Sequence, residues 1–529
     1  MLIGLSITPV INENCLASYY TNQKSDNYDS IQFSDCKLDM DYIFSITENL
    51  SRIIFTEYNE SAGEIAKGRA FGTKGEHKAA EILLENMSKL GLWAYKEKIG
   101  NAKPSFRPIN LISSKIEVLD YELRIKNETI NKTLVCAPII STFGPHWNIL
   151  KIDHNFSYSD LKVKLDHPDP CNDTEEYVIL AGPGSERGEN PPPENKQDRG
   201  YLLDVIIDYI KGRIEKIKNF YQHPNCKAIV GYTRFDNEHN QWNSYSSIPK
   251  FSINGTNGKM IEEDYENFTV DFYLNQRKNN SVESYNVIGQ LNGTNPRKTV
   301  IVCCLYDSWW CQGTGDSAIG MGIVMGIAKW FAEHYAQQKP NYTMKFIGFG
   351  GEEYGMHGSI YYEWIHKLEN IIYVVDLNQV GFTQEYPRLT LNVTSNNQEF
   401  LDEIWKIVQR TDYINRTGNV TDIDPDYYSA GHNSDDRSFA SMRSPDKCKT
   451  LCFLKNGDWY MHHKDGLNHT VGDVIDYFNW TDSKATGEII LNVTKYLVLE
   501  KEDISINQEK SNLSYFIRNI FKRLLSTKD

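Results

Sequence analysis

The sequence predicts an α/β fold: a doubly wound, mostly parallel sheet with a β-rich domain inserted into it. Apolar runs of strand length stand at 300–305, 344–349 and 371–375. A long segment of small and apolar residues, 319–336, separates the first two runs and is typical of a buried helix. Buried strands that alternate with helices form parallel sheets covered on both faces. Between 105 and 285 the chain instead carries short strands, turns and proline-rich loops, which indicate a separate domain.

The segments before and within this insert have their own patterns. Residues 41–95 are predicted to be helical, with one apolar face and Gly91 at the expected end. That face consists of Ala79, Ile82, Leu83, Met87 and Leu90. Inside the insert, 177–180 and 228–232 are predicted strands, and a helix is predicted over 201–221.

A chain of 529 residues exceeds one ordinary hydrophobic core, so several domains are expected. We predict a signal segment, the first part of the main domain, the insert, the rest of the main domain and a polar tail. Their ranges are 1–17, 18–104, 105–285, 286–500 and 501–529. The first segment is mostly apolar and reaches small residues as a secretory signal does, although it lacks a basic start. The alternative for it is a buried N-terminal strand.

Charge and hydropathy limit the partners of the protein. The net charge of −14 repels phosphates, so nucleic acid is not an expected partner. No run of 18 or more apolar residues occurs, and we therefore expect no transmembrane segment. The ten cysteines are an even number, which is compatible with disulfides in an oxidising compartment, but their connectivity cannot be deduced.

Sequons for N-linked glycosylation are far more frequent than the composition of the chain predicts. Their spread along the chain favours an extracellular or cell-surface glycoprotein that is secreted and carries N-linked glycans. The alternative is an asparagine-rich chain with coincidental sequons. The candidate glycosylation sites are Asn49, Asn59, Asn127, Asn131, Asn155, Asn172, Asn254, Asn267, Asn279, Asn292, Asn341, Asn392, Asn415, Asn419, Asn468, Asn479, Asn492 and Asn512.

Polar residues follow each buried strand of the main domain. Asp307 and Asp316 come after the first, and the pair Glu352–Glu353 comes after the second. The third leads into 376–381, and a His-x-x-x-Asp pattern begins at His469. Because the carboxyl ends of parallel strands meet at one edge of a sheet, these side chains are expected to converge. Convergent carboxylates repel one another unless a cation or protons neutralise them, so a metal site is predicted.

This order of residues resembles the di-zinc aminopeptidase family that includes glutamate carboxypeptidase and the non-enzymatic transferrin receptor. The stretch 68–75 is similar to the Arg…Gly-Thr-x-Gly opening of that family. The insert resembles a protease-associated domain, with 228–232 and 247–249 in the expected order. The resemblance covers residues 45–500 and implies a zinc exopeptidase fold that acts on peptides.

The resemblance also implies roles for individual residues. Asp316 matches the Asp that bridges the two metals of the family, and Glu353 and His469 match further ligands of one of them. His462 or His463 is the alternative for the last ligand. Glu352 matches the general base. Asp307 matches the Asp of a His-x-Asp motif, which makes it a supporting catalytic residue.

Two ligand positions of the family are lost in this chain. Leu305 stands where the family has His, and Asn378 stands where it has Asp, a position aligned by Gly381. Leucine has no donor atom, and an amide is a poor zinc ligand beside carboxylate or imidazole. Both losses fall on the same metal, so we expect at most one zinc ion per chain.

Three hypotheses remain open at this point. The first is a non-catalytic structural or binding glycoprotein without zinc, which would self-assemble into a homo-oligomer or surface layer. The second is a secreted mono-zinc exopeptidase, an aminopeptidase or carboxypeptidase. The third is a reaction like that of glutaminyl cyclases, which use one Asp-Glu-His zinc, although the protease-associated insert is foreign to them.

Overall fold

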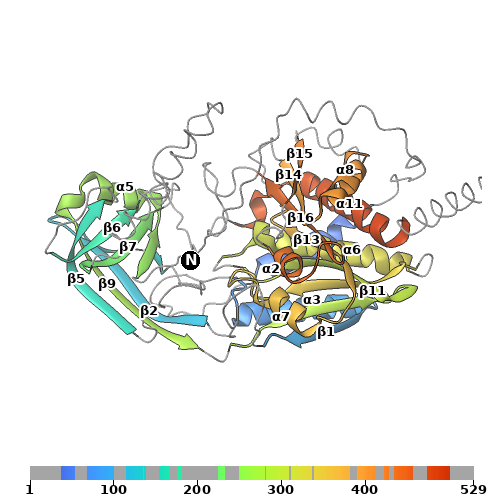
Figure 1. Cartoon of the computed structure of the whole chain (residues 1–529). Coiled ribbons are helices and arrows are strands. Elements are labelled where there is room, and N and C mark those ends of the chain that lie inside the picture. The colour runs from blue at the N-terminus through green and yellow to red at the C-terminus, as the bar shows by residue number, and fades with distance from the viewer. Residues whose placement is uncertain are drawn as a thin grey trace, which may run out of the picture. The chain divides into compact units, whose positions relative to one another are not determined.

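The computed structural model describes residues 37–53, 68–100, 115–134, 136–138, 154–165, 175–181, 224–232, 249–279, 282–308, 311–335, 339–381, 390–410, 422–427, 434–456 and 473–500. The elements from Leu38 onward belong to one compact unit. Two separate eight-stranded sheets account for its strands (Figure 1). No helix in these ranges is long and apolar enough to cross a membrane.

The main sheet has the strand order β1-β10-β12-β11-β13-β16-β14-β15. Its four central strands, β12, β11, β13 and β16, run parallel, whereas β1, β10 and β14 pair antiparallel with their inner neighbours. The prediction of a mostly parallel sheet is therefore confirmed: the central pairs and the edge pair β14–β15 are parallel, and the remaining pairs are antiparallel. In the sheet order, the bounds are Trp93–Lys98, Tyr285–Leu291, Tyr342–Phe349, Asn295–Leu305, Ile371–Asn378, Lys449–Asn456, Thr390–Ser395 and Asp422–Tyr427.

Helices cover both faces of this sheet, as predicted. On one face, α6 (Ile319–His334) packs on β11, β12 and β13, with the ring of Phe331 against that of Phe346. On the other, Tyr362 of α7 (His357–Ile365) and Phe439 of α10 (Asp436–Met442) join the strand residues Ile301, Ile347 and Val374 in one core cluster. The remaining helices are α2 (Met40–Ser51), α3 (Lys74–Lys89), α8 (Gln398–Arg410) and α11 (Trp480–Lys495).

The N-terminal helices begin at side-chain caps. Asp39 caps α2 by accepting the Tyr42 N–H, and Thr73 caps α3 by accepting the Glu76 N–H. The predicted helix over 41–95 is therefore two helices, and the last part of that prediction is wrong. After α3 the chain turns at Gly91, whose φ of 77° favours glycine, and 93–98 form strand β1 on the edge of the sheet.

Helices α2 and α6 approach closely because α6 carries glycines where they meet. A Cβ atom on Gly322 would lie 2.4 Å from Thr47 Oγ1, and one on Gly326 would lie 2.6 Å from the Ile43 side chain. The small residues predicted in this helix thus allow a second helix to pack directly against it, and α6 is almost completely buried.

The second sheet is built only from residues within 115–279, inside the range predicted for the insert. Its order is β3-β2-β9-β5-β6-β7-β8-β4, and α5 (Gly255–Glu263) accompanies it. The predicted strands at 177–180 and 228–232 are present, as parts of β6 and β7. The predicted helix over 201–221 lies outside the described residues. In sheet order the bounds are Asn131–Thr133, Lys115–Lys126, Thr269–Asn279, His154–Leu165, Tyr177–Ala181, Cys226–Tyr232, Lys250–Ile253 and Cys136–Pro138.

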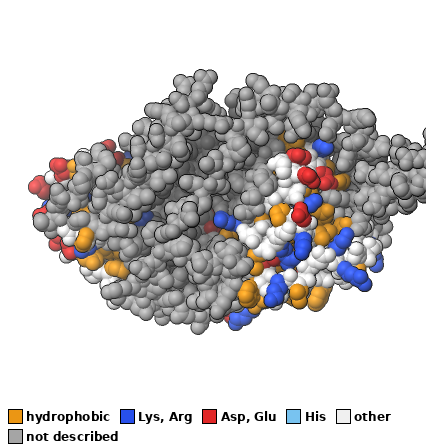
Figure 2. All heavy atoms as spheres, viewed as in Figure 1, with side chains coloured by type: hydrophobic (Ala, Val, Ile, Leu, Met, Phe, Trp, Pro, Cys, Tyr) orange, Lys and Arg blue, Asp and Glu red, His pale blue; other side chains and the backbone are white. Residues whose placement is uncertain are grey.

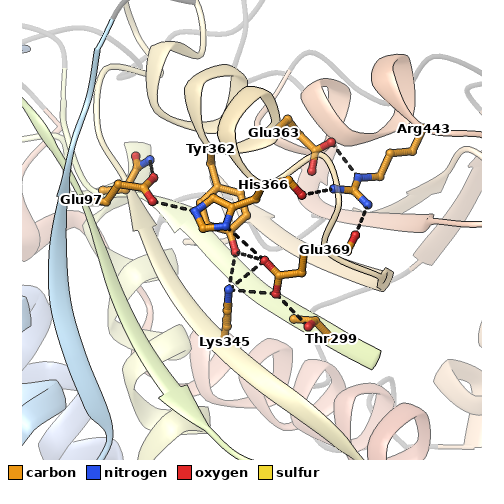
Figure 3. A network of polar contacts seen from close by, with 9 residues as sticks. Glu97, Thr299, Lys345, Tyr362, Glu363, His366, Glu369 and Arg443 are labelled. Carbon is orange, nitrogen blue, oxygen red and sulfur yellow. Dashed lines mark hydrogen bonds and ion pairs between the residues drawn. The ribbon is translucent and has the colours of Figure 1, made fainter. Parts of the chain in front are cut away.

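A partly buried polar network joins α7 to Thr299 of β11 and to Glu369, which precedes β13 (Figure 3). Glu369 accepts hydrogen bonds from Lys345 Nζ at 2.9 Å and from Thr299 Oγ1 at 2.8 Å. His366 Nε2 lies 2.7 Å from Glu97 Oε2, and Arg443 Nε donates to Glu363 at 2.7 Å. The network ties β1, β12, α7 and the residue after α10 together.

Hydrogen bonds within this network shift the pKa values of Glu369 and His366. Burial opposes ionisation of Glu369, but hydrogen bonds from His366 and Lys345 outweigh it and lower its pKa to about 2. Burial likewise opposes the charged form of His366, but hydrogen bonds with Glu369 and Glu97 raise its pKa to about 9. The network therefore contains a protonated histidine at neutral pH.

The described surface visible in Figure 2 mixes acidic, basic and hydrophobic side chains. Lys and Arg side chains do not form one continuous basic patch on this described part of the face, in keeping with the net charge of −14.

Candidate metal centre

The carboxyl ends of the central parallel strands carry the residues that the sequence singles out. Leu305 is the last residue of β11, and Asp307 follows it. Glu352 and Glu353 follow β12, and Asn378 is the last residue of β13. The sheet therefore brings these three segments to one edge, because β12, β11 and β13 are neighbours.

Asp307 fixes the turn that carries the two glutamates. Its buried carboxylate accepts the Glu352 N–H on Oδ1 at 3.1 Å and the Glu353 N–H on Oδ2 at 3.3 Å. Burial, and then the charge of Glu353, raises the pKa of Asp307 to about 8. Since both oxygens are engaged with the backbone, Asp307 positions its neighbours.

Glu352 is the point on which the acidic groups converge. It is half-buried, whereas Glu353 and Asp316 are buried. Burial raises the pKa of Glu352 well above its usual value, and the charges of Glu353, Asp435, Asp316 and Asp307 raise it further. Asp307, Asp316, Glu352 and Glu353 thus lie together, as predicted from their positions after the strands.

Asp316 is held from two sides in the segment that leads into α6. The N–H groups of Gly315 and Asp316 donate to the Asp473 carboxylate at 2.7 and 3.2 Å. The Gln379 side-chain amide donates to Asp316 Oδ2 at 3.0 Å. Burial raises the pKa of Asp473 to about 7, so this anchor lies in a dry environment.

Leu305 and Asn378 stand at the two positions where the resembling family has metal ligands. Leu305 is fully buried, and Asn378 is buried with an Oδ1 that has no hydrogen-bond partner among the described residues. The amide of the next residue, Gln379, occupies one oxygen of Asp316. Asp316 and Glu353 carry carboxylate oxygens of the kind that zinc accepts as ligands. Among the described residues, Leu305 and Asn378 offer no imidazole or carboxylate at the two positions where the family has them.

Sequence reasoning missed two residues of this site. Gln379 has a left-handed backbone, with φ of 54°, which turns its side chain away from the strand direction. Asp435 directly precedes α10, and its charge raises the pKa of Glu352. The Asp435–Asp436 pair before a short helical segment was the available signal, but only the fold shows that it reaches the same end of the sheet.

Comparisons with known proteins agree with this geometry. Residues 286–494 match the model of peptidase family M28. We call residues 286–494 the M28 domain, after the family model that they match. A probable glutamate carboxypeptidase of Arthroderma benhamiae is 36% identical over 84 residues, which span 16% of this chain and 11% of that relative.

Solved structures of other proteins share the fold of this chain over most of its length. A zinc aminopeptidase from Bacillus subtilis superposes with a TM-score of 0.56 at 17% identity, over 87% of this chain and 95% of that one. A peptidase M28 precursor from Shewanella amazonensis gives a TM-score of 0.55 at 14% identity, over 86% and 92%. At these identities the likeness concerns the fold alone.

Some predicted site residues of the M28 domain lie outside the described residues. These are His469, the alternatives His462 and His463, and the tryptophans at 309 and 310. Asp473, which completes the His-x-x-x-Asp pattern, is described and bonds the segment of Asp316.

The sequons fall into distinct classes of exposure. Asn392 and Asn492 are buried, whereas an attached sugar needs solvent around the amide. Exposed or half-buried side chains are found at Asn49, Asn127, Asn131, Asn155, Asn254, Asn267, Asn292, Asn341 and Asn479. The side chains of Asn59, Asn172, Asn279, Asn415, Asn419, Asn468 and Asn512 are outside the described residues.

Six of the described cysteines are buried free thiols: Cys136, Cys303, Cys304, Cys311, Cys448 and Cys452. For these six the expectation of disulfides is wrong. Cys303, for example, lies on β11 and donates to Asp376 at 3.6 Å. Cys15, Cys36 and Cys171 are outside the described residues.

Proposed function

We propose that the M28 domain binds one zinc ion at Asp316, Glu353 and His469 and removes residues from a peptide end, with Glu352 as general base. The observation that supports this most is the convergence of carboxylates on Glu352 at the carboxyl ends of the strands. Buried carboxylates in such a cluster need a cation or protons. Asp316 and Glu353 supply the ligand oxygens that zinc uses.

The residues of the site have separate roles in the proposed peptide hydrolysis. A bound zinc ion would polarise the scissile carbonyl and acidify water. Glu352 accepts the proton of the attacking water and delivers it to the leaving amine. Its raised pKa suits a group that must hold a proton between these two transfers. Asp307 positions the Glu352–Glu353 turn through its two backbone hydrogen bonds.

The experiment is hydrolysis of a panel of amino-acid p-nitroanilides, of peptides with free carboxyl ends and of a glutaminyl peptide. Wild type, Glu352→Gln and Glu353→Gln are compared for activity and zinc content. The proposal expects Glu352→Gln to keep its zinc content and lose turnover, and Glu353→Gln to bind one zinc ion fewer per chain and lose turnover. Cyclisation of the glutaminyl peptide without peptide hydrolysis would instead favour the cyclase-like reaction.

A second candidate is a non-catalytic glycoprotein on the same fold, which would self-assemble or bind a partner. It is favoured by the hydrogen bond from Gln379 to Asp316, which fills one side of the site with a neutral amide, and by the buried Leu305. Wild-type protein that lacks turnover on the whole panel, and whose zinc content Glu353→Gln does not change, would support it.

We further propose that the protein is secreted and carries N-linked glycans. The exposed sequons support this, among them Asn131 and Asn267. Glycosidase treatment of protein from a eukaryotic host, followed by gel mobility, tests it. An unchanged mobility would contradict the proposal.

A further inference from the structure

One buried cluster of the M28 domain, formed by Asp376, Asp436 and Cys452, has no role in the proposed peptidase site. Asp376 on β13 stands in register between Cys303 on β11 and Cys452 on β16. All three side chains therefore point to the same face of the sheet, because residues paired across neighbouring strands share a face. Asp436, the first residue of α10, lies over this row and donates its N–H to Asp376 Oδ2 at 3.1 Å.

The geometry of this cluster is that of a metal-binding site. The ligand atoms of Asp376, Asp436 and Cys452 all lie within 4.8 Å of one another, and all three residues are buried. Ligands of one tetrahedral zinc ion stand about 3–4 Å apart, given bond lengths of about 2.0–2.3 Å. Small side-chain rotations would bring the three atoms onto one ion.

Asp435 provides a second, independent observation. It is fully buried, and neither carboxylate oxygen has a hydrogen-bond partner among the described residues. The nearby Ser359 hydroxyl lowers the pKa of Asp435. That hydroxyl, however, makes its hydrogen bonds with Met356 O at 3.4 Å and Ser438 Oγ at 2.8 Å. The charge that acts most strongly on Asp435 is that of Asp376, so its carboxylate faces the cluster.

The negative charges around the Cys452 thiol also favour a bound cation. Asp436, Asp376 and Asp435, in that order, are the charges that act most strongly on the Cys452 thiol, and all are negative. A buried carboxylate is costly unless it is paired, hydrogen-bonded or bound to a metal. Asp376 accepts hydrogen bonds from Cys303 and from the Asp436 N–H, whereas Asp435 accepts none among the described residues. Three carboxylates around a thiol form a mixed oxygen and sulfur set, and a borderline ion such as zinc accepts both atom types.

We propose that Asp376, Asp436 and Cys452 bind a structural zinc ion that locks α10 onto β13 and β16, with the buried Asp435 carboxylate nearby to balance its charge. The site is closed, since all four side chains are buried, which is typical of structural zinc. Cys452 loses its thiol proton on binding. The sequence does not show a Cys-x-x-Cys spacing for this site, because its ligands come from three separate segments.

Cobalt substitution separates this site from the proposed peptidase site. The full chain is stripped with a chelator and loaded with Co²⁺, and the near-ultraviolet charge-transfer band of a thiolate bound to Co²⁺ is recorded. Asp316, Glu353 and His469 contain no sulfur, so that site cannot produce the band. We expect the band in wild type and in Glu353→Gln, and its loss in Cys452→Ser. The control Cys448→Ser, at a buried thiol outside the carboxylate cluster, should keep it.

A wild-type spectrum without the band, or a band that Cys452→Ser leaves unchanged, would overturn the proposal. If Cys452→Ser does not fold, X-ray absorption of the wild-type zinc protein decides instead. A zinc–sulfur distance of about 2.3 Å supports the site, and a shell of nitrogen and oxygen alone excludes it. Failure of the peptidase site would appear separately, as absent hydrolysis in a protein that shows the thiolate band.

Discussion

The side-chain amide of Gln379 donates a 3.0 Å hydrogen bond to Oδ2 of Asp316, on the carboxylate that matches the metal-bridging position of the family. The bond places a neutral donor on one oxygen of that carboxylate. Together with Leu305 and Asn378 at the two lost positions, it supports our proposal of a single zinc ion at the peptidase site, where the family pattern has two.

Restoring the lost ligands should therefore require removal of this amide. We expect Leu305→His with Asn378→Asp and Gln379→Ala to bind one zinc ion more per chain than wild type. The double variant that retains Gln379 serves as the control and should gain less. Metal analysis after gel filtration measures the difference, and equal zinc in the triple variant and wild type would contradict this interpretation of the site.

Glu352→Gln should lower kcat on a hydrolysed substrate by about 10²–10⁴-fold, the usual contribution of a general base. The glutamine keeps the size of the side chain and its backbone N–H bond to Asp307. Thermal stability and zinc content should therefore stay close to wild type. An unchanged kcat would assign the base to another residue.

The metal-free protein should lose stability as the pH rises. Asp307 and Asp473 have folded-state pKa values of about 8 and about 7, above the ordinary aspartate value. A group whose folded-state pKa is raised contributes stability below its unfolded pKa, and that contribution is lost as the pH rises through the folded value. The free energy of unfolding of chelated protein should thus fall between about pH 4 and 8.

Urea denaturation across this range measures the effect, with Asp307→Asn as the comparison. The variant should show a shallower fall than wild type, since one titrating group is gone. Added zinc should flatten the wild-type profile. A fall of equal steepness in both proteins would show that Asp307 does not carry the effect.

The network around His366 should act in a different pH window. Its pKa of about 9 lies above the ordinary histidine value, so its stabilising contribution is complete below about pH 6.5 and lost as the pH rises through 9. His366→Gln should remove this loss, so that the difference in unfolding free energy between wild type and variant shrinks from pH 6 to pH 10. His334→Gln, at a histidine bonded to the carbonyl of Trp330 in its own helix, is the control. A constant difference would contradict the assignment.

Glycan mapping should follow exposure. In protein secreted from a eukaryotic host, mass spectrometry of glycopeptides should find sugar at exposed Asn131 and Asn267 and none at buried Asn392 and Asn492. The substitutions Asn392→Gln and Asn492→Gln should leave mobility unchanged, whereas Asn267→Gln should increase it. Occupancy at Asn492 would contradict the packing of α11.

The sequence predicts the centre of the fold well because short, continuous apolar runs between turn signals are typical of central strands. The edges follow other rules. Trp93–Lys98 continues a helical pattern in the sequence, and only its pairing with β10 makes it a strand. The carboxylates of the site were predictable, since each follows a buried strand. The roles of Gln379 and Asp435 were not, because they depend on backbone turns and strand register that juxtapose distant segments.

The zinc content and peptidase activity of Glu353→Gln relative to wild type test the central claim most directly. Glu353 is the buried carboxylate that belongs only to the proposed peptidase metal site. The account predicts that the variant binds one zinc ion fewer per chain and loses hydrolysis of the substrates that wild type cleaves. Equal zinc content in the two proteins would contradict it.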